Sequence, residues 1–158
     1  YKIHASEFNA YYALESKGVK LPSGHIPLGL YGDGPELSDK LLALIRSGTK
    51  TATTGLLWEF DHLGLDVDPA GTYELVVDHS GNPEMLLLTT DVEVMPFDEV
   101  GEEHAYNEGE DDRTLKHWRE VHWEFFTNLC EHIGRTPSET MPVVCSSFEL
   151  VEDFKQLD

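Results

Sequence analysis

The sequence predicts a single α+β domain, in which a small, curved and mostly antiparallel sheet or barrel is flanked by helices. Three observations favour this fold class. The predicted helices and strands do not alternate along the chain as they do in a doubly wound α/β fold. Apolar residues recur at helical spacing in some segments and form strand-like runs in others. The 158 residues are 40% hydrophobic and 10% aromatic, which is enough to bury one core.

The N-terminal region, residues 1–24, is expected to hold one helix. The apolar spacing predicts it over residues 6–17, with Ser6 as a candidate cap and Gly18 as its end. A stretch rich in Gly and Pro follows up to residue 34. We expect this stretch to be a loop that wraps over the surface or lines a cleft.

Two further helices and a short strand are expected in the next part of the chain. Pro35 suits the first position of a helix whose apolar face runs to Ile45, and Gly48 ends it. The β-branched residues 51–54 predict a short strand, and residues 56–63 predict a short helix before Gly64.

The second half of the chain holds three expected strands and one long helix. Residues 73–78 and 85–94 are rich in strand formers, and the Gly and Pro between them predict a hairpin. Apolar residues from 115 to 133 fall at steps of three and four, which predicts a helix that ends at Gly134. Residues 141–151 predict a closing strand.

The charge balance limits the partners that the protein can bind. Eleven Lys and Arg face 30 Asp and Glu, a formal charge of −19. Such a chain repels phosphate backbones, so we expect no double-stranded DNA partner and no general nucleic-acid coat protein. No apolar run is long enough to span a bilayer and no signal peptide is evident, so we expect a soluble, cytoplasmic protein with no membrane partner.

The sequence predicts no metal and no cofactor. Cys130 and Cys145 lack metal or disulfide spacing, so both are expected to be reduced and buried. His117 and His122 lie five apart on the long helix, where their side chains are poorly aligned for one ion. The sequence makes no prediction of the oligomeric state.

Three polar clusters next to apolar segments are the candidate sites, namely residues 31–33, 48–54 and 108–122. Each also has a purely structural interpretation. Lys50 follows a helix end, where a cation is favoured, and acids at 108–112 precede a helix N-terminus, where negative charge is favoured. The threonines suit a strand, and Arg119 and His122 suit a solvated helix face.

The clusters together resemble the ASCH domain family, over about residues 25–152. The segment Gly48-x-Lys50-x-x-Thr53 resembles the family signature. Three more segments are similar to the larger bacterial branch of the family: Tyr31-Gly-Asp33, Glu108-Gly-Glu110, and Trp118-Arg119-x-x-His122. Gly55 stands where many members have an arginine, so a bidentate phosphate contact is missing there.

This resemblance implies a PUA-like β-barrel with a cleft for RNA or a nucleoside. Some small members remove the acetyl group of N4-acetylcytidine with a Lys, a Thr and a Glu. Their positions here imply Lys50 as general base, Thr53 as nucleophile and Glu108 as proton shuttle, with Glu110 as a rival. A desolvated lysine and an activated threonine suit such chemistry. The remaining candidates, expected to bind the substrate, are Tyr31, Asp33, Thr54, Trp58, Arg119 and His122.

Two alternatives and one geometric demand remain open. A non-catalytic RNA-binding module would need the cations Arg46, Lys50, Lys116 and Arg119 on one surface. A ribonuclease would need an acid and a base, for which Lys50 and His122 are the first pair to test. In an ideal strand, side chains three residues apart lie on opposite faces, so Lys50 and Thr53 converge only if the backbone turns between them.

Overall fold

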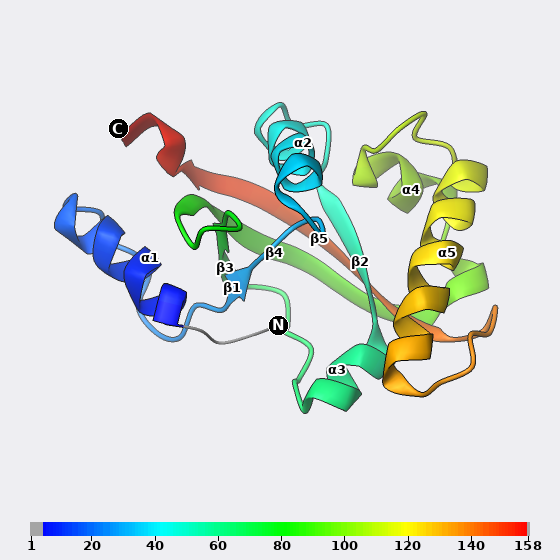
Figure 1. Ribbon diagram of the computed structural model, residues 1–158. Coiled ribbons are helices and arrows are strands. Elements are labelled where there is room, and N and C mark those ends of the chain that lie inside the picture. The colour runs from blue at the N-terminus through cyan, green and yellow to red at the C-terminus, as the bar shows by residue number, and fades with distance from the viewer. Residues whose placement is uncertain (1–4, 158) are drawn as a thin grey trace.

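The computed structural model describes residues 5–157 and has a mixed α+β fold built around one sheet (Figure 1). The strands are β1 (Leu28–Gly29), β2 (Ala52–Leu56), β3 (Tyr73–Val77), β4 (Pro83–Pro96) and β5 (Pro142–Asp153). The α-helices are α1 (Ala5–Ser16), α2 (Pro35–Arg46), α3 (Leu57–Leu63), α4 (Glu102–Glu108) and α5 (Leu115–Ile133), and the short 3₁₀ helices are η1 (Phe97–Glu99) and η2 (Phe154–Leu157).

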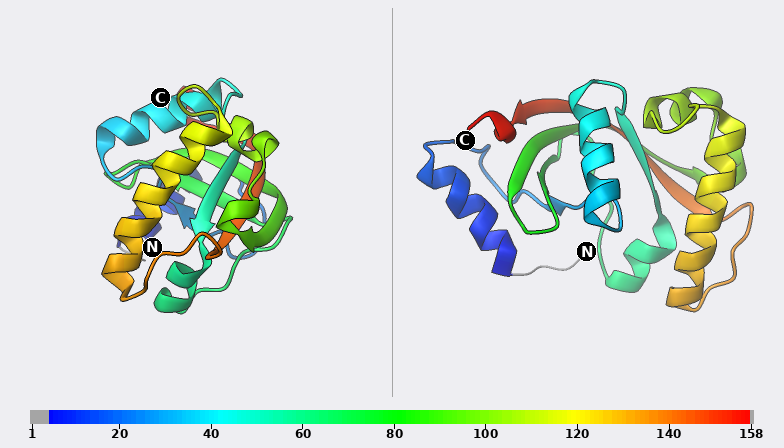
Figure 2. Two further views of the ribbon diagram at one scale, coloured as in Figure 1. Left: turned by 90° about the vertical axis from the view of Figure 1, so that its right-hand side faces the viewer. Right: turned by 45° about the horizontal axis from the view of Figure 1, so that its top comes forward.

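The five strands form an open sheet in the order β1-β3-β4-β5-β2. β1 is parallel to β3, and all other neighbouring pairs are antiparallel. The long strands β4 and β5 pair along most of their length, with two register shifts, and Figure 2 shows how they bend. Within the described residues β1 and β2 are the sheet edges, so the curved sheet is confirmed but a closed barrel is not.

Three apolar clusters fix the helices against this sheet. The first packs α5 against the ends of β2 and β5, with Trp118, Phe126 and Val143 fully or nearly fully buried. The second packs α1 against β3, and the third packs α2 against the opposite face of the central strands. As a result, α1 and α5 lie at opposite ends of the molecule (Figures 1 and 2).

The predicted helices and strands are confirmed, and besides the two short 3₁₀ helices the structure adds two elements. The added elements are the two-residue strand β1 and the helix α4, which lies in a region to which the pattern assigned no element. The first helix begins at Ala5, one residue before the expected cap. Among the described residues, no helix combines the length and the apolar character needed to cross a membrane.

Candidate functional site

The end of α2 places Lys50 in the protein interior. Gly48 turns the chain with a φ of 79°, and the backbone N–H groups of Thr49 and Lys50 both donate to the carbonyl of Leu44. A positive φ favours glycine, because it lacks a Cβ. The chain then enters β2 with the Lys50 side chain only 2% exposed. Its Nζ donates to the Ala52 carbonyl at 2.8 Å.

The end of α4 brings Glu108 to Lys50 from 58 residues further along the chain. Gly109 ends this helix in the left-handed conformation, at a φ of 74°. A Cβ on Gly109 would lie 2.5 Å from the carbonyl oxygen of Thr49, so only glycine allows the two backbones to come this close. The Thr51 N–H also donates to the Asn107 carbonyl, at 2.8 Å.

Lys50 and Glu108 form a buried ion pair. The distance from Lys50 Nζ to Glu108 Oε1 is 3.1 Å, and the two side chains are 2% and 3% exposed. The Glu108 carbonyl lies 3.3 Å from the same nitrogen. The carboxylate of Glu110 lies 3.5 Å from Lys50 Nζ. Its side chain is 31% exposed, so Glu110 lies between the ion pair and the solvent. Four acceptor oxygens therefore surround the Lys50 ammonium.

The second carboxylate oxygen of Glu108, Oε2, contacts three side chains. Oε2 accepts from the Thr54 hydroxyl at 2.7 Å and from the Trp118 indole N–H at 2.5 Å, and it lies 3.1 Å from His122 Nε2. Burial alone would raise the pKa of Glu108. The hydrogen bond from His122 and the charge of Lys50 outweigh burial, and they hold this pKa well below its usual range.

His122 contacts both Trp118 and Glu108. Its Nδ1 lies 2.8 Å from the Trp118 carbonyl, and its Nε2 lies 3.1 Å from Glu108 Oε2. The ring stacks on Trp118 with centroids 4.2 Å apart.

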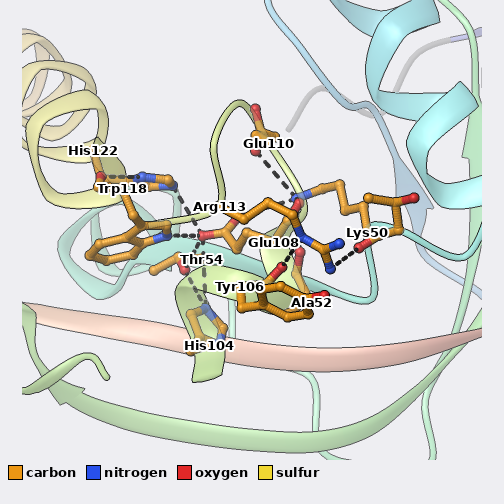
Figure 3. Close-up of polar contacts among 11 residues, drawn as sticks. Lys50, Ala52, Thr54, His104, Tyr106, Glu108, Glu110, Arg113, Trp118 and His122 are labelled. Atoms are coloured by element: carbon orange, nitrogen blue, oxygen red, sulfur yellow. Dashed lines mark hydrogen bonds and ion pairs between the residues drawn. The ribbon is translucent and has the colours of Figure 1, made fainter. Parts of the chain in front are cut away.

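His104 on α4 completes the network. Its Nε2 lies 2.7 Å from the Thr54 hydroxyl, and burial lowers the pKa of His104, which favours the neutral ring. Because Thr54 donates its hydrogen to Glu108, the hydroxyl oxygen accepts from His104. Figure 3 shows Thr54, His104, Trp118 and His122 pointing at one carboxylate, with Lys50 on its other side.

Five of the sequence candidates therefore meet: Lys50, Thr54, Glu108, Glu110 and His122. Negative charge before the N-terminus of α5 does not by itself account for Glu108, because this residue is buried at the end of α4. Sequence reasoning missed His104. The glycines at 101 and 109 and two acids in the first turn are the signals that could have located its helix.

The other candidates lie outside this network. Thr53 pairs with Ser146 and faces the opposite side of β2 from Thr54, and within the described chain its hydroxyl bonds to neither Lys50 nor Glu108. Trp58 packs beside α5 under the guanidinium of Arg135, at 4.8 Å. Arg119 is exposed and donates to the Asp98 carbonyl at 3.3 Å.

A second carboxylate lies near the first polar cluster. Tyr31 donates its hydroxyl to Glu74 Oε1 at 2.9 Å, while Asp33 is exposed in the loop before α2. Burial raises the pKa of Glu74 to about 7, against the opposing effect of the hydrogen bond from Tyr31. Tyr31 also packs edge-on against Phe148, with ring centroids 6.4 Å apart.

Cys145 lies directly opposite Thr54 in the pairing of β5 with β2. Burial, with a smaller contribution from the charge of Glu108, raises the pKa of Cys145 to about 12. Both cysteines are free and buried, as the sequence predicts.

A small cavity lies at the edge of the network. A cavity of about 20 Å³ lies beside Glu108, lined also by Glu110, His117, Trp118 and His122, and it suits one water molecule. Among the described residues, no group of three or more His, Cys, Asp or Glu side chains converges as metal ligands do. The chemistry available here is a fixed ammonium, a fixed carboxylate and a polarised hydroxyl.

The comparison with protein families decides the family. The model of the ASCH domain matches residues 28–152, which is most of the chain. The chain belongs to the ASCH domain family. A comparison with curated proteins found no match.

Two solved structures resemble this ASCH domain closely in fold. The ASCH domain from Lactobacillus crispatus JV V101 has a TM-score of 0.79 at 23% identity, over 94% of this chain and 96% of that chain. Protein EF3133 from Enterococcus faecalis V583 has a TM-score of 0.79 at 28% identity, over 96% of this chain and 91% of that chain. The fold of these two structures thus matches nearly the whole length of this chain.

Proposed function

We propose that this ASCH domain binds a modified nucleoside and hydrolyses an amide bond in it, with N4-acetylcytidine as the model substrate. The observation that carries the proposal is the buried ion pair of Lys50 and Glu108, with a threonine hydroxyl 2.7 Å from the same carboxylate. Burying a lysine and a glutamate costs several kcal/mol for each ion, a cost that a purely structural core avoids with apolar residues.

In this proposal a threonine oxygen attacks the acetyl carbon and Lys50 stabilises the oxyanion. The hydroxyl proton passes to Glu108 and then to the N4 amine as the C–N bond breaks. Water then hydrolyses the acetyl ester on the threonine. Because Lys50 is surrounded by acceptors, we assign it electrostatic stabilisation in place of the general-base role.

Two threonines compete for the role of nucleophile. The family resemblance assigns it to Thr53, whereas the contact with Glu108 favours Thr54. A shift of one residue along a strand moves a side chain to the other face, so the two assignments exclude each other in this conformation.

The charges favour a nucleoside over a long RNA. Arg46 forms ion pairs with Glu84 at 2.5 Å and with Asp153 at 3.1 Å. Lys50 forms an ion pair with Glu108. Arg46 and Lys50 are two of the four cations that an RNA-binding module would need on one surface. An uncharged nucleoside needs no such surface and is not repelled by the net charge of −19.

The test measures acetate release from N4-acetylcytidine by the purified protein and by T53V and T54V. Valine keeps the shape of threonine without its hydroxyl, so each variant is the control for the other. Loss of the nucleophile should lower kcat by about 100-fold or more. If both variants keep wild-type activity, a threonine nucleophile is excluded.

A parallel arm offers a short labelled RNA, with K50M as control. Release of acetate without RNA cleavage supports the proposal. RNA retained intact at moderate salt, with no acetate released, contradicts the proposal and supports the binding module. Shortened RNA that depends on Lys50 and His122 would support the ribonuclease.

A further inference from the structure

Arg113 lies in the turn between α4 and α5 and touches both segments that form the ion pair. Its Nε donates to the Tyr106 carbonyl at 2.9 Å, and its Nη2 donates to the Thr49 carbonyl at 3.3 Å. The guanidinium also stacks on the Tyr106 ring, 3.5 Å from the centroid. Figure 3 shows the Arg113 side chain lying along the Tyr106 ring and reaching the backbone next to Lys50.

The two carbonyls that Arg113 binds are close in sequence to the ion pair. Tyr106 precedes Glu108 by two residues, and Thr49 precedes Lys50 by one. We infer that Arg113 is a positioning residue, which holds the end of α4 against the start of β2 and so keeps Glu108 at Lys50. The four segments that resemble the ASCH family do not contain Arg113.

The backbone supports this role. Arg113 has a φ of 63°, a left-handed conformation that is unfavourable for a residue with a long side chain. Such strain persists only where surrounding contacts hold it, and the side chain of Arg113 supplies three of them.

A lysine cannot replace these contacts. The planar guanidinium binds two carbonyls with separate N–H groups while its face lies on an aromatic ring, whereas an ammonium is a point charge. The geometric part of the inference is independent of catalysis. Only its catalytic consequence rests on the proposed function.

The test is chemical labelling of Lys50. The folded protein is treated with acetic anhydride, and mass spectrometry follows acetylation at Lys50, with the exposed Lys116 as an internal reference. The variants are R113Q and R113K. R135Q is the matched control, because it removes another arginine that stacks on an aromatic ring, at Trp58.

In R113Q we expect Lys50 to be acetylated about tenfold faster than in the wild type, because local opening exposes it. R113K should fall between the two, and R135Q should match the wild type. Labelling of Lys116 and amide exchange in β4 and β5 should stay unchanged, which separates a local effect from a general loss of stability.

Unchanged labelling of Lys50 in folded R113Q would overturn the inference. If R113Q does not fold, R113K decides, since faster labelling of Lys50 supports the inference and wild-type labelling overturns it. For an active hydrolase, R113K should lower kcat and change KM by less than about twofold. If the wild type does not hydrolyse N4-acetylcytidine, the proposed function fails while labelling still decides the role of Arg113.

Discussion

Two glutamates of this protein have pKa values shifted in opposite directions, and their partners explain the difference. Glu108 faces Lys50, the indole N–H of Trp118 and His122 Nε2, so its charged form is stabilised in spite of burial. Glu74 accepts a hydrogen bond from the neutral Tyr31 hydroxyl, and burial then dominates. The partners of a carboxylate, more than its depth, decide its charge.

Removing the charge of Glu108 should destabilise the protein in a pH-dependent way. Its folded pKa lies below the ordinary value of 4.5, so its contribution is present above that pH and is lost as the pH falls. E108Q also leaves Lys50 buried without its partner. We expect E108Q to lose about 3 kcal/mol of unfolding free energy at pH 7 and less at pH 3, measured by urea denaturation. A loss that does not change with pH would contradict this.

For Glu74 we expect the opposite dependence of stability on pH. Its folded pKa of about 7 lies above the ordinary 4.5, so its ionisation costs stability as the pH rises from 4.5 through 7. E74Q removes that cost and should be more stable than the wild type at pH 8, by up to about 3 kcal/mol, with no advantage at pH 4. E124Q, at an exposed position on α5, is the control. Equal thermal stability of E74Q and wild type at both pH values would refute the assignment.

At the scale of elements, α4 depends on Gly109. In G109A the new methyl would lie 2.5 Å from the Thr49 oxygen, in addition to the cost of a positive φ. We expect a loss of about 2–4 kcal/mol, together with faster acetylation of Lys50. G64A is the matched control, because Gly64 ends α3 at a φ of 68° with no atom within 4 Å of the added Cβ. Its expected loss is about 1 kcal/mol. Equal losses in the two variants would show that packing at Gly109 is unimportant.

Sequence patterns predicted some of the helices and site residues but not others. The helices α2 and α5 were predictable because each buries one apolar face. The helix α4 was not, because its seven residues (EEHAYNE) show no apolar spacing and bury only Ala105 and Glu108. The motifs identified Lys50 and Glu108, but the choice between Thr53 and Thr54 depends on strand register. A shift of one residue in the pairing of a strand moves each side chain to the other face. The pattern of so short a strand does not determine which threonine faces Glu108.

The whole molecule carries a net charge of −19, and self-repulsion should therefore limit its stability. Raising NaCl from about 0.02 M to about 0.5 M shortens the range of this repulsion and should raise Tm by several degrees. Near pH 4.5, where carboxylates are partly protonated, the increase should shrink. A fall in Tm with salt at pH 7 would show that local ion pairs, such as those of Arg46, outweigh the repulsion.

The thiol of Cys145, buried across from Thr54, has a practical consequence. With a pKa of about 12, almost none of it is thiolate at neutral pH, and the thiolate is the form that alkylating reagents and oxidants attack. The native fold thus shields this sulfur twice, by packing and by protonation. Iodoacetamide should modify Cys145 only in molecules that have unfolded around it. The rate of this alkylation therefore reports unfolding through a natural residue, without an introduced label.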